Sequence, residues 1–120
     1  MTILAQLVDD VVVNKFELSK PITTVGRHPD SDVQINDAAI SGQHARILLE
    51  KSKYLEGAIE IYLEDLNSKN GSFVNGVKVS GRQALGDNDI IRFGWNEFKL
   101  MDADPKSLEA TALILQQTRS

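Results

Sequence analysis

The sequence predicts an all-β domain built as a β-sandwich, followed by one short helix near the C-terminal end. Roughly ten short segments are rich in β-branched or alternating apolar residues, and turn residues separate them at close intervals. Asn-Gly, a dipeptide typical of tight β-turns, occurs twice in the middle of the chain, at residues 70–71 and 75–76. With 42% hydrophobic residues, the 120-residue chain can form one domain with its own core.

Four strands are predicted in the first half of the chain from their β-branched and apolar residues. They cover residues 2–8, 11–18, 33–35 and 43–49. Asp9-Asp10 separates the first two strands, and residues 21–25 lead from the second into a loop. That loop, at residues 26–32, is indicated by a glycine, a proline and short polar residues, and another loop covers residues 38–42.

The second half begins with a strand at residues 59–64, where apolar and polar side chains alternate. This strand runs into the polar segment Asp65 to Gly76, which contains both Asn-Gly pairs. The second pair lies between short apolar segments and is predicted to close a hairpin. The first pair is assigned instead to a shaped loop, of the kind that forms a binding rim on a β scaffold.

The remaining predicted elements are a turn, a hairpin and a helix. After the turn at residues 86–89, a final hairpin is expected around Trp95-Asn96. Asp104-Pro105 can then open a helix at residues 105–117, because Leu108, Ala112 and Leu115 fall on one helical face. We place the domain at residues 1–101 and this extension at residues 102–120.

The apolar face of the predicted helix needs a surface to cover it, because an isolated helix of this length is only marginally stable. We expect the helix to pack on its own domain near residues 98–101, since residues 102–104 form a short tether. A second copy or a partner protein is the alternative.

Composition and charge exclude several classes of function. A net charge of −4, from 13 basic and 17 acidic residues, disfavours nucleic acid and anionic membranes as partners. No apolar run is long enough to cross a membrane, and the first ten residues do not resemble a signal peptide. The sequence has no cysteine, so it offers no disulfide or thiolate metal site, and its two histidines are isolated. We expect a cytoplasmic protein without metal or cofactor.

Three separated motifs resemble the signature of the forkhead-associated (FHA) domain family, in the family's order. They are Gly26-Arg27, then Ser41-Gly42-Gln43-His44, then Asn70-Gly71 with Asn75-Gly76. The string from Asp65 to Gly76 is similar to the family's central motif at nearly every position, and the resemblance covers about residues 3–101. It implies a two-sheet FHA/SMAD-like sandwich of about eleven strands, whose loops at one end bind phosphothreonine peptides.

The resemblance implies that one set of motif residues binds the phosphopeptide. These residues are Arg27, Ser41, Gly42, Lys69, Asn70 and Asn75. A phosphothreonine carries about −1.5 to −2 charges and three strong acceptor oxygens. Arg27 offers a planar fork of N–H donors to two of these oxygens, and Ser41 can donate its hydroxyl to a third. Asn70 is similar to the family residue that bonds the peptide backbone. Asn75 is a further candidate, although its hairpin role already explains it.

Four other motif residues are implied to be structural. They are Gly26, His44, Gly71 and Gly76. By the same resemblance, His44 is expected to hold the Ser41 loop against the Gly26-Arg27 loop. The chain also departs from the family: Gly42 offers only its N–H where relatives have a polar side chain, and Lys69 stands where Thr or Ser is frequent. We expect the charge of Lys69 to contact the phosphate.

These observations predict a module that docks a phosphothreonine-bearing Ser/Thr kinase or kinase substrate, as an adaptor or scaffold, and catalyses nothing. Catalysis by Ser41, His44 and Asp65 is disfavoured, because nothing supplies an oxyanion hole or a nucleophile elbow. The alternative is a phosphate-independent interaction or dimerisation module. The protein is expected to be a monomer or a weak homodimer.

Overall fold

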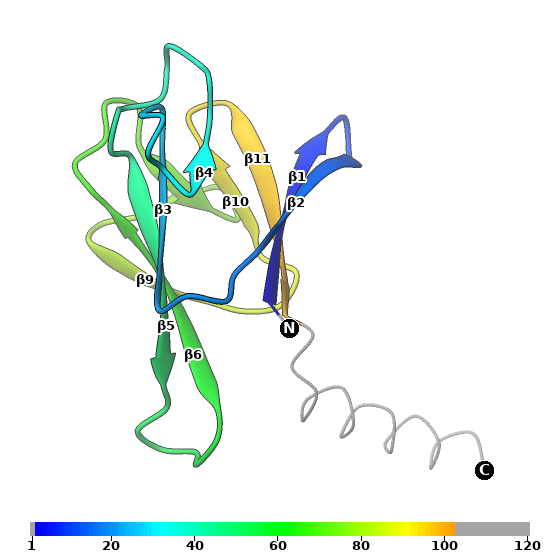
Figure 1. Ribbon diagram of the computed structural model, residues 1–120, viewed down its shortest axis with the longest axis vertical. Helices are drawn as coiled ribbons and strands as arrows, with labels where there is room; N and C mark the ends of the chain where they lie inside the picture. Colours follow the sequence, from blue (N-terminus) through cyan, green and yellow to red (C-terminus); the bar gives the residue numbers. More distant parts are fainter. Residues whose placement is uncertain (1, 103–120) are drawn as a thin grey trace.

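Eleven β-strands make up the part of the chain that the computed structural model describes, residues 2–102, and they form two sheets (Figure 1). The six-stranded sheet has the order β2-β1-β11-β10-β7-β8. Its strands are β1 (Thr2–Val8), β2 (Val11–Glu17), β7 (Ser72–Val74), β8 (Val77–Lys78), β10 (Ile90–Phe93) and β11 (Asn96–Asp102). The five-stranded sheet has the order β4-β3-β5-β6-β9. Its strands are β3 (Ile22–Gly26), β4 (Val33–Gln34), β5 (Ala45–Lys51), β6 (Ile59–Asp65) and β9 (Arg82–Leu85).

This architecture confirms the predicted all-β sandwich. Strand β3 pairs with β4 in parallel and with β5 antiparallel, and the long pairs β1–β11 and β5–β6 are antiparallel. The helix expected at residues 105–117 lies outside the described residues. Between residues 2 and 102, no helix is long and apolar enough to cross a membrane.

The core lies between the two sheets and is filled by alternate residues of their strands. In β10, Ile91 and Phe93 are fully buried, whereas Arg92 between them is on the opposite face. Phe93 packs edge-on against Phe98 of β11, with 5.6 Å between the ring centroids. Burying a side chain of this size contributes about 1.5–3 kcal/mol, so this aromatic pair is a main anchor of the six-stranded sheet.

Four details differ from the sequence prediction. Residues 22–26 form strand β3, although the sequence analysis described residues 21–25 only as leading into a loop. No strand is predicted at β9, because Leu85 is its only partly buried residue and no apolar alternation marks the segment. Strand β5 begins at Ala45 rather than at residue 43, because the side chain of His44 is buried and bonds main-chain groups of two loops. The last hairpin turns at Gly94-Trp95, since Asn96 already pairs with Phe93 in the ladder.

The loops that carry the sequence motifs meet at one end of the sandwich, the upper end in Figure 1. The strand pairing causes this, because β3 and β6 end where β5 begins, and β10 ends where β7 begins. We name three of these connections the Arg27 loop (residues 27–32), the Ser41 loop (residues 35–44) and the Asn70 loop (residues 66–71). The β10–β11 turn, residues 94–95, lies at the same end.

Candidate functional site

The Arg27 and Ser41 loops lie backbone against backbone. The N–H of Arg27 donates to the carbonyl of Ser41 at 3.0 Å, and the N–H of His28 donates to the carbonyl of Gly42 at 3.2 Å. A Cβ atom on Gly26 would lie only 2.1 Å from the Gly42 oxygen, so glycine is required at position 26. The two motif segments are therefore held together by main-chain contacts that leave their side chains available.

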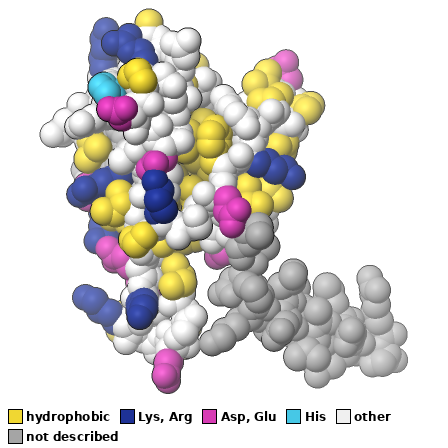
Figure 2. Space-filling view, in the orientation of Figure 1, with side chains coloured by type: hydrophobic (Ala, Val, Ile, Leu, Met, Phe, Trp, Pro, Cys, Tyr) yellow, Lys and Arg dark blue, Asp and Glu magenta, His cyan; other side chains and the backbone are white. Residues whose placement is uncertain are grey.

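Arg27 is exposed, and no ion pair in residues 2–102 involves it. The carboxylates on its own loop have other neighbours: Asp30 lies 3.6 Å from the His28 ring, and Asp32 pairs with Lys20. Figure 2 shows Lys and Arg side chains at this end of the molecule and also along the rest of the visible face. The Arg27 guanidinium is thus a cation with its full set of donors free among the described residues.

Ser41 joins the Ser41 loop to the Asn70 loop. Its hydroxyl oxygen accepts a hydrogen bond from the N–H of Lys69 at 2.8 Å. A hydroxyl can donate one bond while it accepts another, and within residues 2–102 no acceptor takes the Ser41 hydroxyl proton. This proton is therefore free for a ligand, while the oxygen is fixed in position.

His44 is buried, and both of its ring nitrogens bond main-chain groups. Its Nδ1 accepts the N–H of Ser41 at 3.2 Å, and its Nε2 donates to the carbonyl of Gly71 at 2.9 Å. These bonds assign the neutral tautomer with its proton on Nε2. The ring also packs edge-on against Phe93, with 5.6 Å between the ring centroids.

These contacts revise the role expected for His44. Its side chain joins the Ser41 loop to the Asn70 loop, and only its main-chain N–H bonds to the Gly26-Arg27 side, at the carbonyl of Val25. The arrangement also disfavours a catalytic pair. Both imidazole nitrogens are occupied by main-chain groups, so neither is placed to take a proton from the Ser41 hydroxyl.

Asp65 shapes the Asn70 loop from inside, a role that the sequence analysis missed. Its Oδ1 accepts the hydroxyls of Ser68 and Ser72, at 2.6 and 2.7 Å, and its Oδ2 accepts the N–H of Ser68 at 3.1 Å. Burial alone would raise the pKa of Asp65, but these hydrogen bonds outweigh it and hold the pKa below its ordinary value. The loop is therefore folded around an ionised carboxylate.

Lys69 and Asn70 are exposed at the tip of this loop. The Asn70 amide nitrogen donates to the carbonyl of Ala39 at 2.6 Å, which fastens the loop to the Ser41 loop. Because the nitrogen faces that carbonyl, the Oδ1 atom is the free end of the amide and can accept a bond from a ligand. Gly71 follows with φ of 83°, a left-handed backbone conformation that favours glycine at this position.

Asn75 and Gly76 lie apart from these residues, at the far end of β7. The Asn75 amide donates to Asp89 Oδ1 at 3.0 Å and accepts the N–H of Ile90 at 2.9 Å. Both ends of its amide are therefore bonded within the fold. The structure brings together the other five candidates on three loops and leaves Asn75 out. Those five are Arg27, Ser41, Gly42, Lys69 and Asn70.

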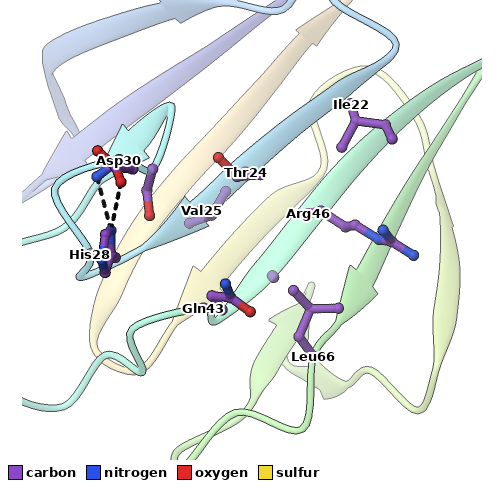
Figure 3. Close-up of a pocket in the computed structure, with 10 residues that line it drawn as sticks. Ile22, Thr24, Val25, His28, Asp30, Gln43, Arg46 and Leu66 are labelled. Atoms are coloured by element: carbon purple, nitrogen blue, oxygen red, sulfur yellow. Dashed lines mark hydrogen bonds and ion pairs between the residues drawn. The ribbon is translucent and has the colours of Figure 1, made fainter.

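A hollow of about 320 Å³ lies beside this cluster, on the outer side of β3 and β5 (Figure 3). Its lining includes His28, Gln43 and Leu66, but none of the side chains of Arg27, Ser41, Lys69 or Asn70. Arg27, Ser41 and Lys69 therefore form an open rim rather than the wall of this hollow, a shape that fits an extended chain better than a small enclosed ligand.

The sequence matches a known family and several known proteins. The family model of the FHA domain matches residues 23–94. The chain is 34% identical over 88 residues to the glycogen accumulation regulator GarA of Mycolicibacterium smegmatis, a match that covers 73% of this chain and 49% of that relative. The chain thus spans about half the length of the curated relatives it matches.

Solved structures with a similar fold are also FHA domains. The FHA domain of the CT664 protein from Chlamydia trachomatis is 30% identical with a TM-score of 0.73, over 86% of this chain and 98% of that one. A chain from a structural and functional analysis of phosphothreonine-dependent FHA domain interactions is 28% identical with a TM-score of 0.71, over 86% and 97% of the two chains. The motifs, the two-sheet sandwich and these matches together show that the chain belongs to the FHA-domain family.

Proposed function

We propose that this domain binds protein segments that contain a phosphothreonine, and that it does so without catalysis, as an adaptor or regulated scaffold for a Ser/Thr kinase or a kinase substrate. The observation that carries the proposal is the unused hydrogen-bonding capacity on three loops that are fastened to one another. The Ser41 hydroxyl and the Asn70 amide are each fixed by one hydrogen bond and keep a free donor or acceptor, and the exposed Arg27 side chain stands on a loop whose backbone is fixed.

Each free group matches one part of the ligand. The Arg27 fork can bond two phosphate oxygens, and the Ser41 hydroxyl and the Gly42 N–H can donate to the remaining ones. Lys69 adds a second positive charge next to a ligand that carries about −1.5 to −2 charges. The Asn70 oxygen can accept a main-chain N–H of the bound segment. We assign Asn75 no role in this binding, because both ends of its amide are bonded within the fold and it lies at the far end of β7.

The affinity should be modest. Two or three charge-assisted hydrogen bonds contribute about 1.5–3 kcal/mol each, and ordering the peptide opposes them. We expect a dissociation constant in the micromolar range at best, since 1 μM corresponds to a binding free energy of about −8 kcal/mol, near the upper end of that sum. The backbones of the loops are already fastened to one another, so the entropic cost of binding comes from ordering the peptide and the exposed side chains of Arg27 and Lys69.

Calorimetric titration with phosphothreonine peptides from a degenerate library tests the proposal. The unphosphorylated form of the best peptide should bind at least about tenfold more weakly, and its phosphoserine form about fourfold more weakly, because one buried methyl group is lost. Arg27→Gln should abolish binding with little change in melting temperature. Lys15→Gln removes the same charge from the exposed strand β2 and should change nothing. Equal affinity for the phosphorylated and unphosphorylated peptides would contradict the proposal.

A second candidate is a phosphate-independent interaction module, and the edge of the six-stranded sheet favours it. Strand β2 is an edge strand, and Val8, Val11 and Val13 at the β1–β2 hairpin are 53–61% exposed. Exposed apolar residues on an unpaired strand edge can add a strand from another chain. Sedimentation of the protein and of Val11→Lys separates the two candidates: a dimer that this change dissociates supports the second one.

A further inference from the structure

Arg92 of β10 is held against two aromatic rings at the same end of the sandwich. Its guanidinium carbon lies 4.0 Å from the ring centroid of Phe73 and 5.6 Å from that of Trp95. Its Nη1 also donates to the carbonyl of Gly94 at 2.8 Å. A stacked, partly buried guanidinium has already lost much of its conformational freedom, so a ligand that bonds to it incurs a smaller entropic cost.

The charge of Arg92 has no carboxylate partner among residues 2–102. Glu97 stands directly opposite in the β10–β11 ladder, yet the two side chains form no ion pair. An arginine carries five N–H donors, and the bond to Gly94 uses one of them. Arg92 therefore keeps both its charge and several donors for a ligand.

These residues surround a hollow of about 240 Å³. Its lining consists of Asn70, Phe73, Arg92, Gly94 and Trp95, and we name it the Arg92 hollow. Asn70 is shared with the proposed phosphopeptide site, so the two sites adjoin. Trp95, at the tip of the β10–β11 turn, is 81% exposed, which leaves a large apolar ring uncovered next to a cation.

The hollow is fixed relative to the phosphate-binding loops. The Asn96 amide, which follows Trp95, donates to Asp37 Oδ2 on the Ser41 loop at 3.0 Å. A Cβ atom on Gly94 would come within 3.2 Å of the Ile40 side chain on that same loop, so the turn packs closely on it. A peptide anchored at Ser41 and Asn70 therefore meets the Arg92 hollow at a constant distance.

We propose that the Arg92 hollow is a second contact site for the bound peptide and takes an aspartate or glutamate side chain close in sequence to the phosphothreonine. The carboxylate accepts hydrogen bonds from Arg92, and its methylene groups cover part of the Trp95 ring. The inference rests on the proposed function and adds a preference for acidic phosphopeptides. Such a preference is local, since the whole chain carries a net charge of −4.

A scan of phosphothreonine peptides tests this. Each peptide has one aspartate at a single position on either side of the phosphothreonine in an alanine background, and a matched peptide has asparagine there. Aspartate should strengthen binding about three- to tenfold over asparagine at one position, because one charge-assisted bond is gained at a partly exposed site. Arg92→Gln should remove that gain. Lys15→Gln, which removes an equal charge from β2, should leave it unchanged.

Because Arg92→Gln also removes a stacked side chain, the result is read as a double-mutant cycle. The two peptides and the two proteins give a coupling that is insensitive to a general weakening of the site. Arg92→Lys should retain part of the preference, since it keeps the charge without the planar fork. Trp95→Ala should reduce affinity for the aspartate peptide more than for its alanine parent.

The outcomes separate the two proposals. If phosphorylated peptides bind no better than unphosphorylated ones, the proposed function is wrong and this inference falls with it. If phosphorylation is required but aspartate and asparagine bind equally at every position, only the acidic contact is overturned. A phenylalanine that strengthens binding at one position and loses its effect in Trp95→Ala would assign the hollow to aromatic residues and also overturn the acidic preference.

Discussion

The same dipeptide occurs at residues 70–71 and 75–76, and the two copies differ in how much hydrogen-bonding capacity they leave unused. In Asn75-Gly76 both residues have positive φ, 50° and 84°, and both ends of the Asn75 amide are bonded within the fold. In Asn70-Gly71 only the glycine has positive φ, and the Asn70 amide uses its nitrogen alone. Both asparagines are exposed, so exposure does not separate a structural residue from a binding residue. The two residues differ instead in whether the amide oxygen is left without a hydrogen-bond partner in the fold.

The largest effect on stability is expected from substituting His44, because its side chain holds Asn70-Gly71 in position through the carbonyl of Gly71. His44→Ala leaves the partly buried N–H of Ser41 and the buried carbonyl of Gly71 without their partner and opens a cavity beside Phe93. We expect a loss of about 3 kcal/mol or more in unfolding free energy, together with loss of phosphopeptide binding. Urea denaturation measures the first and calorimetric titration the second. His28→Ala, on the exposed Arg27 loop, is the matched control and should leave stability unchanged; a stable His44→Ala protein would contradict the assigned tie.

Asn75→Ala should lower the unfolding free energy by about 1–2 kcal/mol and leave phosphopeptide affinity unchanged. The change removes two side-chain bonds and places a Cβ-bearing residue without them at φ of 50°. Asn75→Gly loses the same bonds without the backbone strain, so the difference between the two variants isolates the strain. Any loss of affinity in Asn75→Gly, measured by calorimetry under folded conditions, would place Asn75 in the binding site after all.

Asn70→Ala should do the reverse, weakening phosphopeptide binding about tenfold with a small change in melting temperature. It removes the free amide oxygen and one exposed bond to the carbonyl of Ala39. Asn70→Asp should bind more weakly still, because it loses that bond and adds a negative charge near the phosphate. If Asn70→Ala instead binds normally and melts early, then the two Asn-Gly copies are both structural.

The smallest effect concerns the pH dependence of stability. Hydrogen bonds hold the pKa of Asp65 below its unfolded value, so its stabilisation is present above that value, about 3.9, and is lost as the pH falls through the folded pKa. Asp65→Asn keeps an oxygen acceptor and should flatten this acid-side slope in denaturation curves measured between about pH 2 and pH 5. Asp10→Asn, at the exposed β1–β2 turn, is the control; a slope unchanged in Asp65→Asn would place the titrating group elsewhere.

Local patterns predicted most of the strands and the loop that carries the first Asn-Gly copy, because those features depend on neighbouring residues; β3 and β9 were not predicted as strands. The β7–β8 hairpin at Asn75-Gly76 follows from turn chemistry alone, and the structure has it. Strand β9 could not be predicted, since pairing with β6 rather than its own apolar pattern makes it a strand.

Contacts across the sheets could not be predicted either. The bond from His44 to Gly71 depends on two loops 27 residues apart meeting at one end of the sandwich. The stacking of Arg92 on Phe73 depends on their register in the β7–β10 ladder, which the residues alone do not reveal. Asn75 is a binding candidate in the sequence because of the resemblance to the FHA motif, and the bonds at both ends of its amide are visible only in three dimensions.

The contact between Gly26 and Gly42 has a consequence for how such a domain could be retuned. No side chain fits at Gly26, whereas a Cβ atom on Gly42 would meet nothing within 4 Å. One partner of the contact is therefore intolerant of substitution, and the other is permissive while it faces the ligand rim. Position 42 allows new side chains to change ligand selectivity at little cost in folding stability. Substitutions at position 42 can therefore change which ligands bind while the rest of the fold stays the same. A library of all amino acids at this position should yield folded variants that differ in ligand selectivity.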